Sequence, residues 1–215
     1  MTERRNLFVH CNGIVSAQYL AVCSKHGCDC SKVNVGQELH VNPKYFQDAY
    51  ATIVEIGLKL AHVLWRRLKP EQMDEADTSL NNLCLDLIRD EKYAVARTLL
   101  DFASQFKAFG SETIRKICIL NRAQAYKWSG QDKRAKEILA AEDWEAANEK
   151  LQLGAAVLND DFKGASRLMK HIGASDAPSK GDYKEWPIFK MFRTSPEFAE
   201  AYSRRCSASP SERSP

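Results

Sequence analysis

Apolar residues recur every three or four positions through the middle of the chain, which is the period of an amphipathic α-helix. The first strong segment runs from Asn42 to Leu68. Asn42 is a good N-cap and Pro43 suits the first helical position, where a missing N–H costs no helical hydrogen bond. Pro70 ends the run. We therefore expect one long amphipathic helix, whose apolar face holds Ile53, Ile56, Leu60, Val63 and Leu64.

Further segments with the same period follow at short intervals. They span residues 74–89, 92–106, 111–128, 133–140, 144–158 and 162–172. Gly130 and Gly173 stand where a left-handed residue often ends a helix. Because each connection is only a few residues long, consecutive helices are expected to run antiparallel as hairpins. No alternating apolar and polar run bounded by hairpin turns occurs, so the sequence predicts an all-α fold.

The two ends of the chain lack this regular period. Residues 1–41 contain several glycines and predict a loosely structured segment, a short helix with loops. The Ser/Pro-rich residues 206–215 predict a disordered tail. Between them, residues 42–205 form the expected helical domain. Near its end, the aromatic stretch 183–192 has the composition of a cap over the last helices, and Ser195-Pro196-Glu197 predicts the start of one more short helix.

The middle helices share a recurring pattern of small and large apolar residues. Ala96, Ala135 and Ala165 hold equivalent places in the second helix of successive pairs, with an average spacing close to the ~34 residues of a tetratricopeptide unit. Over roughly residues 78–172 the pattern resembles the tetratricopeptide family, although the Trp, Leu-Gly and closing Pro of that family are largely missing. The resemblance implies helix hairpins stacked as a superhelical array with a C-terminal capping helix. A plain helical bundle is the alternative.

The same resemblance implies a ligand groove lined by the first helix of each pair. The candidate peptide-binding residues are then Asn81, Asn82, Leu85, Asn121, Gln124 and Lys127. Asn82 and Asn121 take equivalent places, where family members that bind peptide tails hold the ligand with asparagine. In those proteins a Lys or Arg one turn earlier pairs with the terminal carboxylate, but here Thr78 and Ile117 stand there. The expected ligand is a less charged protein or peptide segment, and simple solvation of both amides is the alternative.

One cluster combines cysteine and histidine, the residue types that commonly bind zinc in proteins. It consists of Cys23, His26, Cys28 and Cys30, with Cys11 upstream. A structural zinc site prefers C-x2–4-C pairs that wrap the ion, and the alternation of Cys28 and Cys30 strains that geometry. Free thiols are the favoured interpretation, so we predict no metal and no cofactor. Seven cysteines in a chain without an export signal are typical of reduced thiols in a cytoplasmic protein.

The common enzyme motifs are absent, since the sequence has no phosphate loop, no G-x-S-x-G and no H-E-x-x-H. Arg167 and His171 lie one helical turn apart, which a helical RNA-processing or toxin-like enzyme could use on a phosphodiester. Their apolar neighbours Leu168 and Met169 indicate an ordinary amphipathic helix instead. We predict an interaction adaptor and no enzyme, with that enzyme class and a regulatory subunit of a larger complex as alternatives.

Composition and net charge limit the classes of binding partner that we expect. The apolar fraction of 44% and charged fraction of 27% are those of a globular protein. The net charge of +3 and sequence pI of about 8.4 fall short of the pI above ~9 that marks a nucleic-acid-binding domain. No run approaches the ~18 apolar residues of a membrane span. We expect a protein or peptide partner, neither nucleic acid nor membrane, and the oligomeric state stays open.

Overall fold

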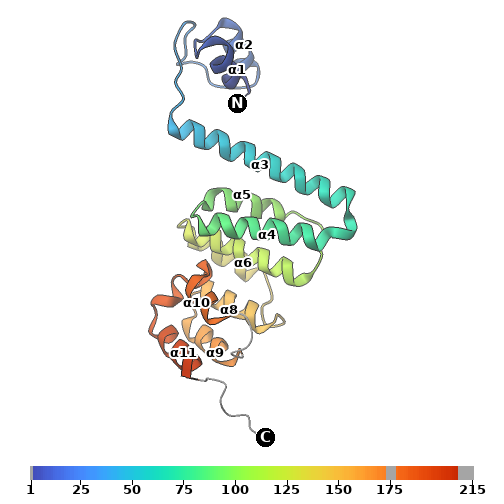
Figure 1. The fold of residues 1–215 in the computed structure, drawn as a ribbon, viewed down its shortest axis with the longest axis vertical. Coiled ribbons are helices and arrows are strands. Elements are labelled where there is room, and N and C mark those ends of the chain that lie inside the picture. The colour runs from blue at the N-terminus through green and yellow to red at the C-terminus, as the bar shows by residue number, and fades with distance from the viewer. Residues whose placement is uncertain (1, 173–177, 208–215) are drawn as a thin grey trace. The chain divides into compact units, whose positions relative to one another are not determined.

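The computed structural model describes residues 2–172 and 178–207, and its architecture is helical (Figure 1). No β-strand occurs within those residues, and one isolated bridge joins Ile14 and Glu38, so the all-α prediction is confirmed. The α-helices are α1 (Thr2–Cys11), α2 (Ala17–Lys25), α3 (Pro43–Leu68), α4 (Met73–Arg89), α5 (Tyr93–Ala103), α6 (Glu112–Trp128), α7 (Asp132–Ala140), α8 (Glu149–Leu158), α9 (Phe162–His171), α10 (Lys180–Glu185) and α11 (Pro196–Ser207). Short 3₁₀ helices are η1 (Pro70–Gln72), η2 (Pro187–Phe189) and η3 (Phe192–Thr194).

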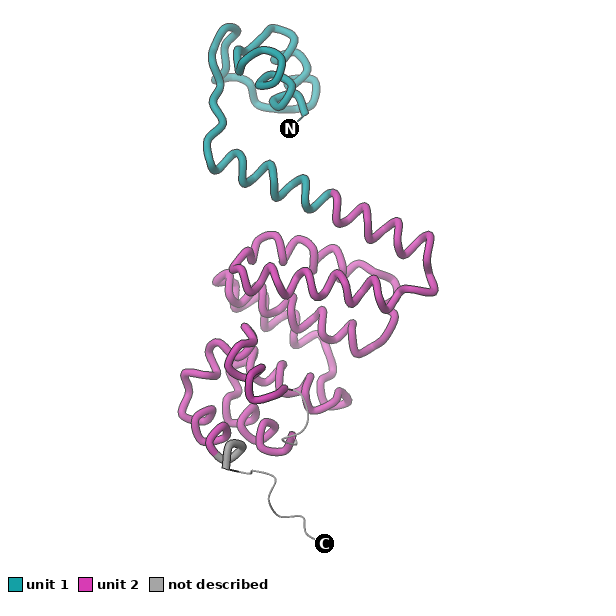
Figure 2. The backbone as a smooth tube through the Cα atoms, in the orientation of Figure 1, with its two compact units in different colours: residues 1–56 teal, residues 57–215 magenta. Residues whose placement is uncertain are grey.

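The chain divides into two compact units, residues 1–56 and 57–215 (Figure 2). The first unit contains α1, α2 and the beginning of α3. Its small interior is centred on Leu7 and Val15, both buried. Ser16 caps α2 by accepting a hydrogen bond from the Tyr19 N–H at 3.1 Å. The first 41 residues therefore hold two short helices, where the sequence indicated one.

Helix α3 starts at the expected place, because the Asn42 side chain accepts a hydrogen bond from the Tyr45 N–H at 2.8 Å. Residues from Gly57 onward belong to the second unit. There Leu58 packs against the core of that unit, and His62 is buried. The apolar residues on the other side of α3 are exposed, although an apolar stripe usually faces a core.

The second unit is built from helix hairpins. Helices α4 and α5, α6 and α7, and α8 and α9 pair in sequence, while α4 packs on α6 and α6 on α8 (Figure 1). Tight left-handed turns close the pairs: Glu91, Gly130 and Asp160 have positive φ, as predicted for Gly130. Small residues lie where helices approach closely, with Ala96, Ala123, Ala135 and Ala165 all buried. The first apolar core joins α4, α5 and α6, and the next joins α6, α7 and α8.

The aromatic C-terminal segment completes the core of the third hairpin. Tyr183, Phe189 and Phe192 are fully buried against Leu153 and Met169 of α8 and α9. Helix α11 packs on α9. Its start is fixed by Ser195, whose hydroxyl accepts a hydrogen bond from the Phe198 N–H at 3.2 Å. The apolar face of α8 and α9 is thus covered by residues that follow it in the chain.

Helix boundaries agree with the sequence at most points, and the largest difference is at α8. The periodicity predicts a start near Trp144, but α8 begins at Glu149 because the Asn148 side chain caps it, accepting from the Leu151 N–H at 3.1 Å. Residue 173 and most of the predicted tail, 208–215, lie outside the described residues. In the part of the chain that is described, no helix has the length and apolar character needed to cross a bilayer.

Candidate functional site

The first helices of the three hairpins line an apolar cavity of about 390 Å³. Its floor comes from α4, α6 and α8, and its far wall from the segment Trp186–Phe189. Of the residues named from the sequence, Asn81, Asn82, Leu85, Asn121 and Gln124 line this cavity, together with Ile117, Leu120 and Leu151. Helical spacing on α4 and α6 therefore brings these residues to one concavity, and binding by them stays a prediction.

Two of the asparagines bind each other. The Asn121 side-chain N–H donates to the Asn81 Oδ1 at 2.8 Å, and the Cys118 thiol approaches the same oxygen at 3.7 Å. Asn81 and Asn121 are both buried, so their pairing ties α4 to α6. Asn82, one residue along α4, is exposed and lines the cavity. Of these asparagines, Asn82 presents its amide to solvent.

Gln124 is fully buried and holds the chain's own backbone. With its amide oriented by its neighbours, the side-chain oxygen accepts hydrogen bonds from the Trp128 indole N–H and the Ile188 backbone N–H, each at 3.1 Å. Gly154 lets the segment approach, because a Cβ there would lie 2.9 Å from Leu120 Cδ1 and 3.3 Å from Ile188 Cδ1. The amide of Gln124 thus binds the backbone of the 3₁₀ helix η2 of this protein.

Lys127 lies outside the cavity. Its ammonium donates to the Leu158 carbonyl at 2.8 Å and to Asp160 Oδ1 at 2.6 Å, and its side chain is 6% exposed. A cation there satisfies a carbonyl at the C-terminal end of α8 and the adjacent carboxylate. The structure therefore places Lys127 as a link between α6 and the α8–α9 turn, where the sequence pattern had placed it in the groove.

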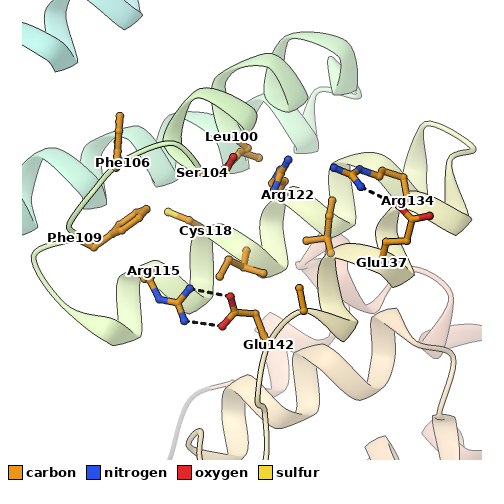
Figure 3. Close-up of a pocket in the computed structure, with 13 residues that line it drawn as sticks. Leu100, Ser104, Phe106, Phe109, Arg115, Cys118, Arg122, Arg134, Glu137 and Glu142 are labelled. Atoms are coloured by element: carbon orange, nitrogen blue, oxygen red, sulfur yellow. Dashed lines mark hydrogen bonds and ion pairs between the residues drawn. The ribbon is translucent and has the colours of Figure 1, made fainter.

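A second cavity, of about 290 Å³, lies among α5, α6 and α7 (Figure 3). Arg115, Arg122 and Arg134 line it, but each already has an acidic partner. Arg115 binds Glu142 with two hydrogen bonds of 2.8 and 2.6 Å and also binds Glu112, lowering the pKa of the Glu112 carboxyl. Arg122 binds Asp101 at 2.7 Å and Arg134 binds Glu137 at 2.8 Å. The Arg122–Asp101 pair joins α6 to α5, and Arg115 joins α6 to Glu142 just after α7, whereas Arg134 and Glu137 both lie on α7. Each of the three arginines that line the cavity is thus compensated by an acidic side chain.

The two other candidate sites, the Arg167–His171 pair and the cysteine cluster, have no further catalytic or metal-binding side chains arranged around them among the described residues. His171 is exposed and its Nδ1 lies 2.5 Å from Glu149 Oε1, while Arg167 is exposed on α9. Among the described residues, no group of three or more His, Cys, Asp or Glu side chains is arranged to hold a metal ion. Cys11 and Cys28 are exposed, Cys23 and Cys30 are half-buried, and all four are free thiols.

Comparison of the chain with models of protein families, with curated protein sequences and with solved structures finds no match.

The far wall of the cavity was missed by reasoning from the sequence. Trp186, Pro187, Ile188 and Phe189 were expected to cap the last helices, and they also turn back over the first helices of the hairpins. Short 3₁₀ turns carry no long period that would show which face they cover. The one available signal is Pro187, which interrupts the helical period in an aromatic stretch and favours an extended conformation for the residue before it, Trp186.

Proposed function

We propose that this chain is a tetratricopeptide-like helical-repeat adaptor, which binds a short apolar segment of another protein in the cavity between the first helices of its hairpins. The observation that carries the proposal is the cavity of about 390 Å³ over α4, α6 and α8, beside the 3₁₀ helix η2, whose Ile188 backbone N–H donates to the side chain of Gln124. The protein's own Ile188 illustrates the kind of contact that a ligand would make.

The array in this proposal is supported by the order of helix packing. Each first helix packs on its own partner and on the next first helix, α4 on α6 and α6 on α8. Contacts restricted to neighbouring units are typical of repeat proteins, whose successive units line one continuous surface. The pairing of Asn81 with Asn121 joins consecutive first helices on that surface.

The chemistry of the lining indicates the ligand class. Leu85, Ile117, Leu120 and Leu151 supply apolar surface, and Lys150 is the charged side chain among the lining residues. The volume falls within the ~300–1,000 Å³ of typical ligand sites. A segment with two or three apolar side chains fits this lining, and the amide of Asn82 is available to a backbone group of the ligand. The proposed partner is therefore an apolar peptide segment.

A peptide display library selected on the full chain tests this function. Peptides enriched on the wild type should lose at least about tenfold in affinity for Leu85→Lys, since a charge would be desolvated in an apolar site, a loss of roughly 1.4 kcal/mol or more. Ser79→Lys adds the same charge at an exposed position of α4 outside the cavity, and should bind like the wild type. Failure to enrich any peptide, or equal binding to both variants, would refute the proposed groove.

A further inference from the structure

The turn after α2 folds the chain back over the end of that helix, in a stretch that is rich in cysteine. The Gly27 N–H donates to the Ser24 carbonyl at 2.9 Å and the Cys28 N–H to the Cys23 carbonyl at 3.0 Å, which are the two hydrogen bonds of a Schellman motif. Gly27 has the positive φ, +74°, that this motif requires. In such a motif the side chain two residues past the C-cap often contacts that of the third residue from the helix end. Here those two residues are Cys28 and Cys23.

Cys30, two residues further along, lies in the same cluster. Its thiol is hydrogen-bonded with the thiol of Cys23, and both residues are half-buried. An Asx turn holds the backbone there, because Asp29 Oδ1 accepts a hydrogen bond from the Ser31 N–H at 2.9 Å. Burial, and then the charges of Cys23 and Cys28, raise the pKa of the Cys30 thiol. Charges shift a pKa in this way at short range, so the three sulfurs lie close together.

Tyr19 adds a neighbour on the helix side of the cluster. It lies one turn before Cys23 on α2, and its hydroxyl is hydrogen-bonded with the Cys23 thiol. Burial, followed by this hydrogen bond, raises the pKa of Tyr19 to about 12. The Cys23 sulfur therefore lies between a neutral phenol and the sulfur of Cys30.

We propose that Cys23 and Cys30 are a redox-active dithiol, which small-molecule disulfides such as oxidised glutathione convert to an intramolecular disulfide. This pair is favoured because its two thiols already contact each other and neither residue is fully buried. Cys84 and Cys118, by contrast, are buried in the core of the second unit, where such an oxidant does not reach them.

The reaction consists of two thiol–disulfide exchanges. One protein thiol loses its proton and attacks a sulfur of oxidised glutathione, which forms a mixed disulfide and releases one glutathione thiolate. The other protein thiol then loses its proton and attacks the protein sulfur of the mixed disulfide, which forms the Cys23–Cys30 bond and releases the second thiolate. The two protons pass to the two glutathione thiolates, so the protein gives up two electrons and two protons. The bond ties the loop after α2 to the last turn of that helix.

Equilibration of the full chain in glutathione redox buffers, with air excluded, tests this dithiol. Each sample is quenched with N-ethylmaleimide, digested with trypsin without reduction, and analysed by mass spectrometry. Cleavage after Lys25 separates Cys23 from Cys30, so their disulfide joins peptides 6–25 and 26–32. All proteins carry Cys11→Ser, which removes the other cysteine of peptide 6–25. The joined peptide should form as oxidised glutathione increases and disappear when reduced glutathione is restored.

Two pairs of variants locate the bond. Cys30→Ser should lower the yield of joined peptide at least about tenfold, because the second exchange loses its thiol, whereas Cys28→Ser should leave the yield unchanged. Gly27→Val should lower it at least about threefold, because a positive φ is strained for valine although its side chain has open space. Gly36→Val is the matched control, with a φ of +84° and equally open surroundings, and should behave like the parent. The helical circular dichroism spectrum should be the same for all four variants.

Three results would overturn the proposal. One is the absence of joined peptide in the most oxidising buffer. Another is glutathione attached to Cys23 or Cys30 with no joined peptide, which would make them separate modification sites. The third is a Cys30→Ser protein with the same yield as the parent, which would assign the bond to Cys28.

Discussion

Replacing Arg66 should cost the second unit a large share of its stability. The Arg66 guanidinium pairs with Asp77, whose side chain is 1% exposed, and it also donates to the Ala108 carbonyl. The guanidinium carbon of Arg66 lies 4.0 Å from the centre of the Phe106 ring. Asp77 in turn accepts from the Gly110 N–H at 2.8 Å. These contacts tie the end of α3 to α4 and to the loop after α5.

The magnitude follows from the burial of the pair. Arg66→Met keeps most of the apolar stem but leaves the Asp77 carboxylate buried with one backbone donor. Removing one partner of a buried ion pair costs about 3–5 kcal/mol, because the remaining charge is uncompensated. With total stabilities of about 5–15 kcal/mol, that loss is a substantial fraction. Adding Asp77→Asn should restore part of it, with a coupling energy of about 1–3 kcal/mol, since the amide is neutral and still accepts from Gly110.

Urea unfolding followed by circular dichroism measures these free energies, with hydrogen exchange to detect local release of the end of α3. Arg67→Met is the control, because Arg67 is exposed on the same helix, and it should change stability by no more than about 0.5 kcal/mol. If Arg66→Met costs under about 1 kcal/mol, or if the double variant is simply additive, the pair contributes little and the reasoning from burial is wrong.

The remaining predictions concern titration and reactivity. Burial lowers the pKa of His62 in the folded protein, so as the pH falls the unfolded chain binds a proton at this residue before the folded one does. The contribution of neutral His62 to folding stability should therefore be fully present above about pH 6.5 and be lost as the pH drops through the lowered pKa. His62→Gln should flatten that decline in urea titrations, and an unchanged pH profile would contradict it. Burial raises the pKa of the Cys84 and Cys118 thiols to about 12, so at about pH 8 iodoacetamide should modify exposed Cys11 in the native protein and reach the other two only after unfolding. Mass spectrometry of the native protein that finds Cys84 modified as fast as Cys11 would refute this.

Local sequence signals located the helices because the caps and breaks are themselves local. Asn42, Ser111 and Ser195 each accept a hydrogen bond from a backbone N–H three residues ahead, which depends on residue type and nearby spacing alone. Helical period also brought Asn82 and Asn121 to one concave surface. Long periodic segments determine which faces of a hairpin point inward, whatever the remainder of the chain does.

Contacts between distant residues could not be predicted in this way. Lys127 has the spacing of a groove residue, but it binds the carbonyl of Leu158 and the carboxylate of Asp160, some thirty positions later. The Gln124 side-chain oxygen likewise accepts a hydrogen bond from the backbone N–H of Ile188, which is distant in the sequence. Periodicity shows that a helix has an apolar face without showing which residues cover it.

The aromatic C-terminal segment has a consequence for the order in which the protein is made. Leu153 of α8 and Met169 of α9 are buried in a core that includes Tyr183, Phe189 and Phe192, so the third hairpin has no complete core while the chain still ends at His171. The core of α4, α5 and α6, by contrast, needs nothing beyond Trp128. At about 5–20 residues per second, synthesis leaves the third hairpin exposed for several seconds after the earlier helices can fold. A chain truncated before residue 183 would lack these aromatic residues. Its α4–α6 core could still form, but the apolar face of α8 and α9 would stay exposed to solvent.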